Sequence, residues 1–311
     1  MFSVLSAVLE PFLLIALGYA LRGTKRFGAK ELWDGVEKLV FWVLFPPLLF
    51  NSVAHAKLTG LDTAEFLLFG TLAMATGVFM AKAVSKMAPA DPMTDASVRQ
   101  TGYRFNSYIC FALALNMYGQ EALALVALLT GIWVPISNAI AVADLSYAAK
   151  TGGKTSVGSI VKSIFTNPLI VSTLAGLFAN ILSHLTGFQV PNFITKIFSS
   201  LGSASMATAL LAIGAGLAVE DFARYKKLIA LSTIQRLTAV ALAVAVATGL
   251  ADTQTAALMC YAVVPTANSC YIMAARMGGN GPVVSDLTSV EVLVSLATIP
   301  MWCMALQAFV F

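Results

Sequence analysis

The chain carries a proline and several polar residues inside an apolar segment near its C-terminal end. In "AVVPTANSCYIMAARMGGN" (262–280), Pro265, Asn268 and Ser269 interrupt what otherwise resembles the middle of a membrane-spanning helix. Proline has no backbone N–H, so backbone groups around it lose their helical partners. In lipid, such groups are tolerated only where they face protein or a water-filled cavity. The pattern therefore predicts two half-helices with polar groups at the break.

An earlier segment has a similar pattern. "FNSYICFALALNMYGQ" (105–120) contains an Asn-Ser pair, followed by apolar residues that end in Met and Gly. Helix N-termini present free N–H groups and partial positive charge, and amide side chains add donors without the cost of a fixed charge. Two such ends meeting at one point predict an anion site that Asn106 and Ser107 share with Pro265, Asn268 and Ser269. The alternative is a proline kink whose asparagines bond neighbouring helices.

Four further polar residues lie in or beside apolar segments. Arg236 and Glu291 are intramembrane charges, which are functional candidates by default, and Glu291 is a candidate carrier of a coupling proton. Pairing of the two, separate snorkelling, and a carboxylate clamp by Arg236 stay open. Asp144 lies near a helix end, where an interfacial role is expected. Asn138 follows Pro135 closely and is a candidate to line the substrate cavity.

Composition places these residues in an all-α polytopic membrane protein. Of 311 residues, 59% are hydrophobic and 11% charged, against about 25% charged in a soluble domain. Apolar runs separated by glycine, proline and charge predict ten transmembrane helices, at 3–21, 35–54, 64–86, 95–118, 122–148, 157–183, 194–218, 228–249, 254–277 and 285–310.

The basic residues predict the orientation and the division into halves. Most loop lysines and arginines follow odd-numbered predicted helices; examples are Arg22 after the first helix, and Arg99 and Arg104 around the third connection. Because basic loops stay in the cytoplasm, both termini are predicted to lie outside it. Residues 1–149 and 150–311 each hold five predicted helices, and five is odd. The second half therefore enters the membrane inverted, and its broken ninth helix crosses the broken fourth.

Several classes of function find no support. Cysteines 110, 260, 270 and 303 lie in apolar runs without paired spacing, so neither disulfides nor a metal site is expected. No base accompanies Ser107 or Ser269, so an intramembrane enzyme is not expected. A phosphate-binding GxxxxGK[ST] motif is absent, which argues against an ATP-driven pump. We expect no cofactor and no nucleic-acid partner; the partners are the lipid bilayer and a small molecule, and a homodimer stays open.

The segment "VPTANSCYIMAARMGGNGPVVSDLTSVEVLVSLATIPMW" (264–302), with "TNPLIVSTLAGLF" (166–178) and "LVFWVLFPPLLFNSV" (39–53), resembles the auxin efflux carrier family. Its bacterial malonate or malate permease branch is the most similar, and the resemblance spans the chain. It implies ten helices, a substrate carboxylate held by Asn106 and Asn268, and a scaffold of helices 1, 2, 6 and 7. It also implies a plasma membrane location, here a bacterial inner membrane.

These observations predict a secondary transporter of small organic anions, such as malonate, malate or auxin-like carboxylates. The protein would transport the substrate by alternating access of an elevator type. The alternatives are a sodium or proton antiporter, a sodium-coupled anion symporter, and a channel or receptor. An antiporter would place acidic residues at the crossing, where this sequence has amides. The substrate, the direction of transport and the choice of proton or sodium coupling stay open.

Overall fold

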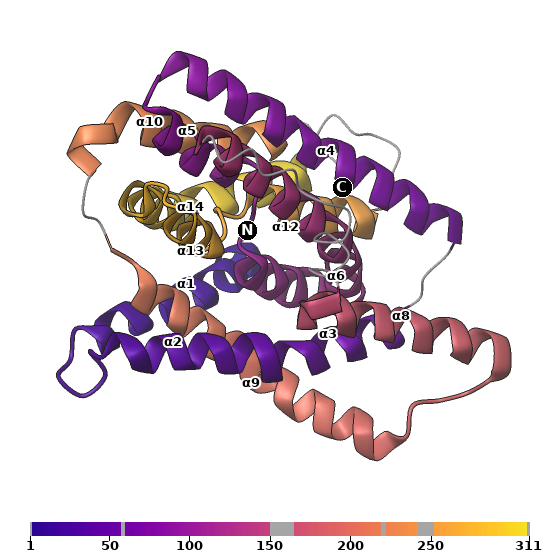
Figure 1. Ribbon diagram of the computed structural model, residues 1–311. Coiled ribbons are helices and arrows are strands. Elements are labelled where there is room, and N and C mark those ends of the chain that lie inside the picture. Colours follow the sequence, from indigo (N-terminus) through magenta and orange to yellow (C-terminus); the bar gives the residue numbers. More distant parts are fainter. Residues whose placement is uncertain (1, 57–59, 150–164, 219–221, 242–251, 310–311) are drawn as a thin grey trace.

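The computed structural model describes residues 2–56, 60–149, 165–218, 222–241 and 252–309, all of them in helices and short connections (Figure 1). The α-helices are α1 (Phe2–Arg22), α2 (Lys30–Leu39), α3 (Phe45–Ala54), α4 (Gly60–Met87), α5 (Pro92–Arg99), α6 (Ser107–Ala148), α8 (Pro168–Thr186), α9 (Asn192–Gly216), α10 (Phe222–Ile234), α12 (Asp252–Val263), α13 (Ser269–Arg276) and α14 (Gly281–Phe309). Shorter turns are the π-helical η1 (Val40–Leu44) and η3 (Gln235–Ala239), and the 3₁₀ turn η2 (Gln100–Gly102).

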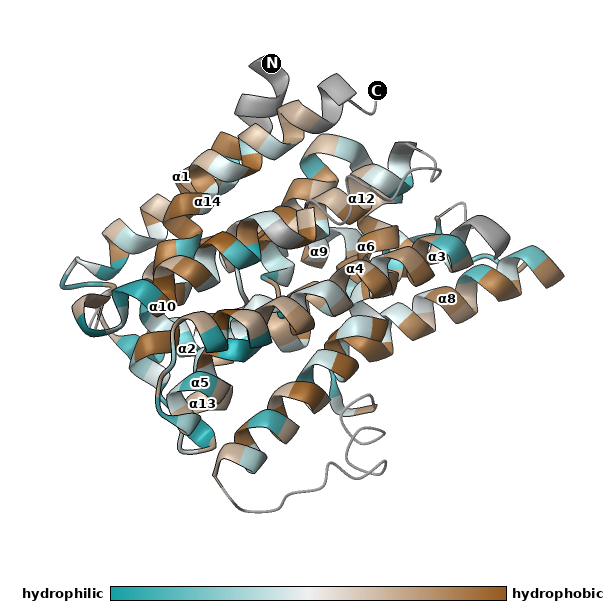
Figure 2. Ribbon diagram, turned by 90° about the horizontal axis from the view of Figure 1, so that it is seen from above, coloured by the Kyte–Doolittle hydropathy of each residue, from teal (hydrophilic) through white to brown (hydrophobic). Residues whose placement is uncertain are grey.

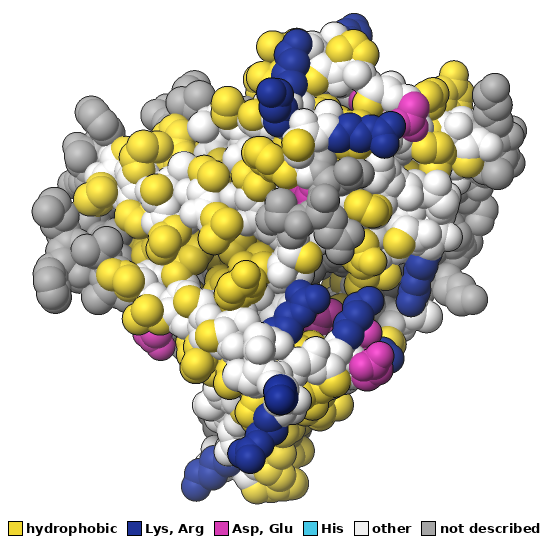
Figure 3. Space-filling view, turned by 90° about the vertical axis from the view of Figure 1, so that its left-hand side faces the viewer, with side chains coloured by type: hydrophobic (Ala, Val, Ile, Leu, Met, Phe, Trp, Pro, Cys, Tyr) yellow, Lys and Arg dark blue, Asp and Glu magenta, His cyan; other side chains and the backbone are white. Residues whose placement is uncertain are grey.

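The surface of the molecule is that of a membrane protein. Six helical stretches of the described residues are long and apolar enough to cross a bilayer, at Lys30–Ala54, Thr63–Met87, Pro92–Ala148, Pro168–Thr186, Asn192–Gly216 and Gly281–Ala305. Large apolar side chains such as Phe79 and Leu185 are exposed. One face carries many hydrophobic side chains, with the lysines and arginines gathered in separate groups (Figure 3). Apolar residues also dominate most of the long helices (Figure 2).

Local sequence explains where the helices begin and change pitch. Asn167 caps α8, because its Oδ1 accepts a hydrogen bond from the Leu169 N–H at 3.0 Å, and Pro168 occupies the first helical position. The π-helical turn η1 lies just before Pro46, which cannot donate to the preceding turn. Gly119 has φ 77° and kinks α6 into two parts. The second part matches the predicted helix 122–148, while the first covers only residues 107–118 of the predicted helix 95–118.

The helices form two groups with α6 between them. In Figure 1, α2, α3, α8 and α9 lie together along the lower edge, and α4, α5 and α10 along the upper. Glycines bring α1 against α9: a Cβ on Gly18 would lie 2.0 Å from the Leu211 carbonyl oxygen, and one on Gly214 would lie 1.8 Å from that of Ile15. Such close backbone contact is how membrane helices pack without a hydrophobic driving force. Helix α1 therefore packs closely against α9 of the lower group.

The predicted helix ranges agree with the structure where it describes them. The range 64–86 corresponds to α4 and the range 194–218 to α9, each within a few residues. Residues 157–164 and 242–249 of two predicted helices, and the boundary segment after residue 149, lie outside the described residues. The count of ten helices, the inverted repeat and the side of each terminus stay predictions.

Candidate functional site

Two helical segments of the chain are interrupted, and their interruptions touch. The first break separates η2, which ends at Gly102, from α6; the second separates α12 from α13. At the contact, the Asn106 N–H donates a hydrogen bond to the Pro265 carbonyl oxygen at 2.8 Å. The rings of Phe105 and Tyr261 pack beside it with centroids 3.9 Å apart. Both breaks fall where the sequence predicts them, and they meet in the interior.

Neutral groups satisfy the backbone of the first break. The Trp133 indole N–H donates to the Tyr103 carbonyl oxygen at 2.8 Å, and the Gln235 amide donates to that of Gly102 at 3.0 Å. Asn106 caps α6, because its Oδ1 accepts from the N–H groups of residues 108 and 109, each at 3.1 Å. Asn106 is therefore buried and serves as a helix cap in this conformation.

Arg104 lies inside the first break and is 6% exposed. Its guanidinium donates to Gln100 Oε1 at 2.6 Å and to Ser269 Oγ at 2.8 Å, and contacts Met273 Sδ at 3.7 Å. The ion pairs found between described residues both involve Arg99. Arg104 therefore keeps a buried positive charge without a carboxylate partner in the described part of the chain. Grouping it with the loop cations, as the sequence analysis does, is wrong.

Two buried charges satisfy the backbone of the second break. Arg236 donates to the carbonyl oxygens of Ala262 at 3.0 Å and Tyr261 at 3.3 Å, at the C-terminal end of α12. Glu291 Oε2 accepts from the Thr266 N–H at 2.7 Å. Both charged side chains are fully buried, and they attract each other electrostatically. Neither the direct ion pair nor separate snorkelling describes them, because each is bonded to the broken backbone.

Each of these two charged groups also has an unused atom. Arg236 Nε and Glu291 Oε1 are buried and have no hydrogen-bond partner. Arg236 follows Gln235 in the π-helical turn η3, so neighbouring residues of one turn reach different breaks. π-Helical turns recur at functional sites because they redirect side chains within a helix. Here the turn connects the two interruptions through α10.

The other predicted site residues lie in differing surroundings. Asn268 is half-buried and its side chain makes no cap hydrogen bond to α13, while Ser269 beside it is exposed. Ser107 is half-buried at the start of α6, and Pro265 is buried. The structure thus brings five of the predicted binding residues together at the crossing, with Arg104 in addition.

Asn138 and Asp144 lie farther along α6. The Oδ1 of Asn138 is buried without a hydrogen-bond partner, and no hydrogen bond connects this side chain to the crossing among the described residues. Asp144 Oδ1 lies 3.6 Å from an Arg99 guanidinium nitrogen, and Arg99 also contacts Asp95 at 3.4 Å. Asp144 is therefore partnered, and its ion pair joins α6 to α5.

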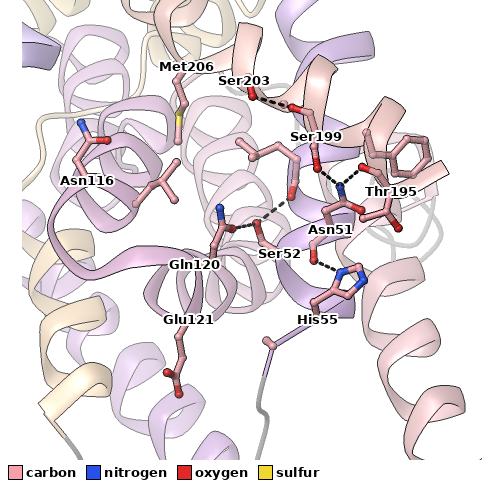
Figure 4. A pocket seen from close by; sticks show the side chains of 15 residues that line it. Asn51, Ser52, His55, Asn116, Gln120, Glu121, Thr195, Ser199, Ser203 and Met206 are labelled. Carbon is pink, nitrogen blue, oxygen red and sulfur yellow. Dashed lines mark hydrogen bonds between the residues drawn. The ribbon is translucent and has the colours of Figure 1, made fainter. Parts of the chain in front are cut away.

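A cavity of about 580 Å³ lies apart from the crossing, between α3, α6 and α9 (Figure 4). Apolar atoms make up most of its lining surface, and amides and hydroxyls contribute to the polar part: Ser52 donates to Gln120 Oε1 at 3.0 Å, and Asn51 donates to the Thr195 carbonyl oxygen at 3.1 Å. None of the predicted site residues lines it. No local sequence pattern indicates this cavity, because its lining residues come from three helices that are distant in the sequence.

The sequence analysis also left Arg104 out of the site. Its position two residues before Asn106, next to an apolar segment, is the one signal that places it with the break. Counting charges for orientation obscures that signal, because the count treats every arginine near a predicted helix end as a loop residue.

One family model matches part of the chain. No curated protein matches the chain. Residues 153–303, slightly less than half of the chain, match the model of a family described as membrane transport protein. The matched range contains the second break, Arg236 and Glu291, and ends before the close of α14. Together with the apolar helices, this match indicates that the chain is a membrane transporter.

Proposed function

We propose that the protein is a secondary transporter of small organic anions, which bind through a carboxylate at the crossing of the two broken helices. The observation that carries this proposal is Arg104, a buried guanidinium without a carboxylate partner among the described residues. Uncompensated buried charge is costly, and an anionic ligand would supply the missing partner. Planar guanidinium groups also match carboxylate geometry through paired hydrogen bonds.

The surroundings of Arg104 favour an anion. The N-terminus of α6 lies at Asn106 and that of α13 at Ser269, so two partially positive helix ends adjoin the crossing. Arg104 donates to Ser269, which is exposed, so the guanidinium is one side chain away from an accessible surface. Asn268 adds an amide that capping does not use. Arg104, Asn268 and Ser269 form the binding site of this proposal, with Asn106 and Ser107 at its other side.

Alternating access would move the crossing past the lower helices. The close backbone contact between α1 and α9 favours these helices, with α3 and α8, as the fixed support. The 580 Å³ cavity lies between α3 and α9 on one side and α6 on the other, at the boundary that an elevator-type motion would use. A bacterial inner membrane, malonate or malate as substrate, and both termini outside belong to the same proposal.

A second candidate function is cation exchange, either of sodium or of protons. One observation favours it: Glu291 has a buried carboxylate oxygen without a hydrogen-bond partner. Against it, the ligands available at the first break are amides, hydroxyls and a guanidinium, which favour an anion. A sodium-coupled or proton-coupled anion carrier would combine both features. The two candidates can be distinguished by which ions raise the melting temperature of the protein and which ions it transports across the membrane.

The experiment measures thermal unfolding of the purified protein with malonate, malate and indole-3-acetate, and carboxylate uptake into proteoliposomes. A ligand that binds the folded state raises the melting temperature by mass action. We expect at least one carboxylate to do so, and Arg104→Met to lower its affinity by roughly tenfold or more. Arg276→Met removes an exposed positive charge from the other end of α13 and serves as the matched control.

Two results would count against the anion carrier. Carboxylate affinity that is equal in wild type and Arg104→Met would remove the guanidinium from the site. Stabilisation by sodium with no response to any carboxylate would favour cation exchange. Uptake that saturates and shows counterflow is expected of a carrier, while a pore would give neither.

A further inference from the structure

The second break presents two backbone carbonyl oxygens to one buried guanidinium, and a buried carboxyl group bonds the backbone on the other side of the break. The carbonyl oxygens of Tyr261 and Ala262 accept from Arg236, and Glu291 interacts with it electrostatically. All three residues and Arg236 are at most 1% exposed. Glu291 still has one free oxygen, Oε1, and Arg236 one free donor, Nε. Two buried carbonyl oxygens therefore bind a single positive charge, with the Glu291 carboxyl group at the same break.

Oxygen ligands of this kind normally select a mobile cation. The last carbonyl groups of a helix have no intrahelical partner and carry partial negative charge. In transporters with broken helices, such carbonyls coordinate the coupling ion. A carboxylate next to them would complete a site for a small monovalent cation. In this protein the position is taken by a side chain that stays charged at every accessible pH.

We propose that Arg236 is a built-in cation that occupies what would otherwise be a sodium site at the second break, so that the protein needs no bound sodium to hold this break in shape. Removing the guanidinium exposes the Tyr261 and Ala262 carbonyl oxygens and Glu291 together, and this set then binds a free cation. Arg236 acts here as a positioning residue, because it holds the backbone of the crossing and touches no substrate.

The contact pattern argues against a pair built only for stability. An arginine and a carboxylate that stabilise each other normally form two parallel hydrogen bonds. Here the guanidinium donates to the two carbonyl oxygens, and the carboxylate accepts from the Thr266 N–H. Both groups are thus directed at the broken backbone, one at the end of α12 and the other just before α13. A free cation could replace only the first of these contacts.

The test is thermal unfolding of the purified full chain without any carboxylate, in sodium, potassium and choline chloride at equal ionic strength. Wild type is expected to melt at the same temperature in all three salts. Arg236→Ala is expected to melt lower in choline and to recover on the order of 5 °C with saturating sodium or with guanidinium at millimolar, non-denaturing concentration. Arg236→Ala/Glu291→Gln lacks the anionic oxygen and should show no recovery by sodium.

A purely structural role predicts the loss in Arg236→Ala but no rescue by a free ion. If Arg236→Ala folds and neither sodium nor guanidinium raises its melting temperature, the proposal is overturned. Wild type that is stabilised by sodium over choline would overturn it as well. If Arg236→Ala does not fold, Arg236→Lys is measured in its place. This variant keeps a tethered positive charge, so its melting temperature is expected not to change with sodium. A clear rise of its melting temperature in sodium would contradict the proposal.

This inference and the proposed function can fail separately. The melting experiment contains no organic anion, so its outcome does not depend on the substrate. An absence of carboxylate binding would leave the cation result intact, and a sodium-dependent wild type would leave Arg104 as the anion partner.

Discussion

The two helix breaks differ in the side chains that bond their free backbone groups. Each leaves carbonyl and N–H groups without helical partners inside a membrane, where every unsatisfied group is costly. At the first break, Trp133, Gln235 and Asn106 provide neutral hydrogen bonds. At the second, Arg236 and Glu291 provide charges of opposite sign.

The difference determines where free charge is left. At the second break both the guanidinium of Arg236 and the carboxyl group of Glu291 are hydrogen-bonded to the broken backbone. The first break needs no charge for its backbone, yet Arg104 lies beside it without a carboxylate among the described residues. The first break therefore has a buried cation that its backbone does not use, while at the second break the guanidinium is bound to the backbone itself.

Glu291→Leu is expected to cause the largest loss of stability. It leaves Arg236 as an uncompensated buried charge and the Thr266 N–H without its acceptor. Breaking a buried charge pair costs about 3–5 kcal/mol. Unfolding of the detergent-solubilised protein would measure this loss. Arg236→Met/Glu291→Leu should recover part of it, and a Glu291→Leu variant as stable as wild type would contradict the charged capping of the second break.

Gln235→Leu tests the neutral capping of the first break, one residue away from Arg236. The variant removes the donor to the carbonyl oxygen of Gly102, which is a buried residue. A buried acceptor without a partner costs about 1–3 kcal/mol. Thermal unfolding measures the loss, and Ile234→Ala on the exposed side of the same helix is the control.

The paired variants Asn106→Ala and Asn268→Ala separate capping from binding. Asn106 makes two cap hydrogen bonds, so its loss is expected to cost about 1 kcal/mol of stability. Asn268 makes none, so the Asn268→Ala variant should unfold as wild type does. If the proposed site is correct, Asn268→Ala nevertheless abolishes carboxylate binding in the melting experiment. Normal carboxylate binding by Asn268→Ala would remove that residue from the site.

The smallest effect is expected at Asp91, which lies away from both breaks and caps α5. Hydrogen bonds from the side chain and the backbone N–H of Thr94 hold the pKa of Asp91 below its ordinary value. A lowered folded-state pKa means that the stabilisation is present above the ordinary carboxyl pKa and is lost as the pH falls through the lowered one. Asp91→Ala should therefore cost about 0.5–1 kcal/mol at pH 7. The difference in melting temperature should shrink as the pH falls below the ordinary carboxyl pKa; a difference independent of pH would rule out the charged cap.

Features that depend on local sequence could be predicted well. Pro265 predicts the second break because proline lacks an N–H, and Asn167 with Pro168 predicts the start of a helix. The partners of buried charges could not be predicted, because the groups they bond belong to other helices. Arg236 is bound to carbonyl oxygens of α12, and no periodicity in α10 encodes that contact. The cavity between α3, α6 and α9 could not be predicted from the sequence either, because its lining residues belong to different helices.

The contact between the two breaks also has a consequence for how the chain is made. The Asn106 N–H finds its acceptor at Pro265, and Arg104 donates to a residue 165 positions later in the chain. A nascent chain that has inserted only through α6 therefore holds an unsatisfied N–H and a guanidinium lacking one of its acceptors inside the membrane. The ribosome must deliver α13 before these groups are satisfied. We expect the first half synthesised alone to be retained by the insertion machinery or degraded, and expression of the second half as a separate chain to rescue it.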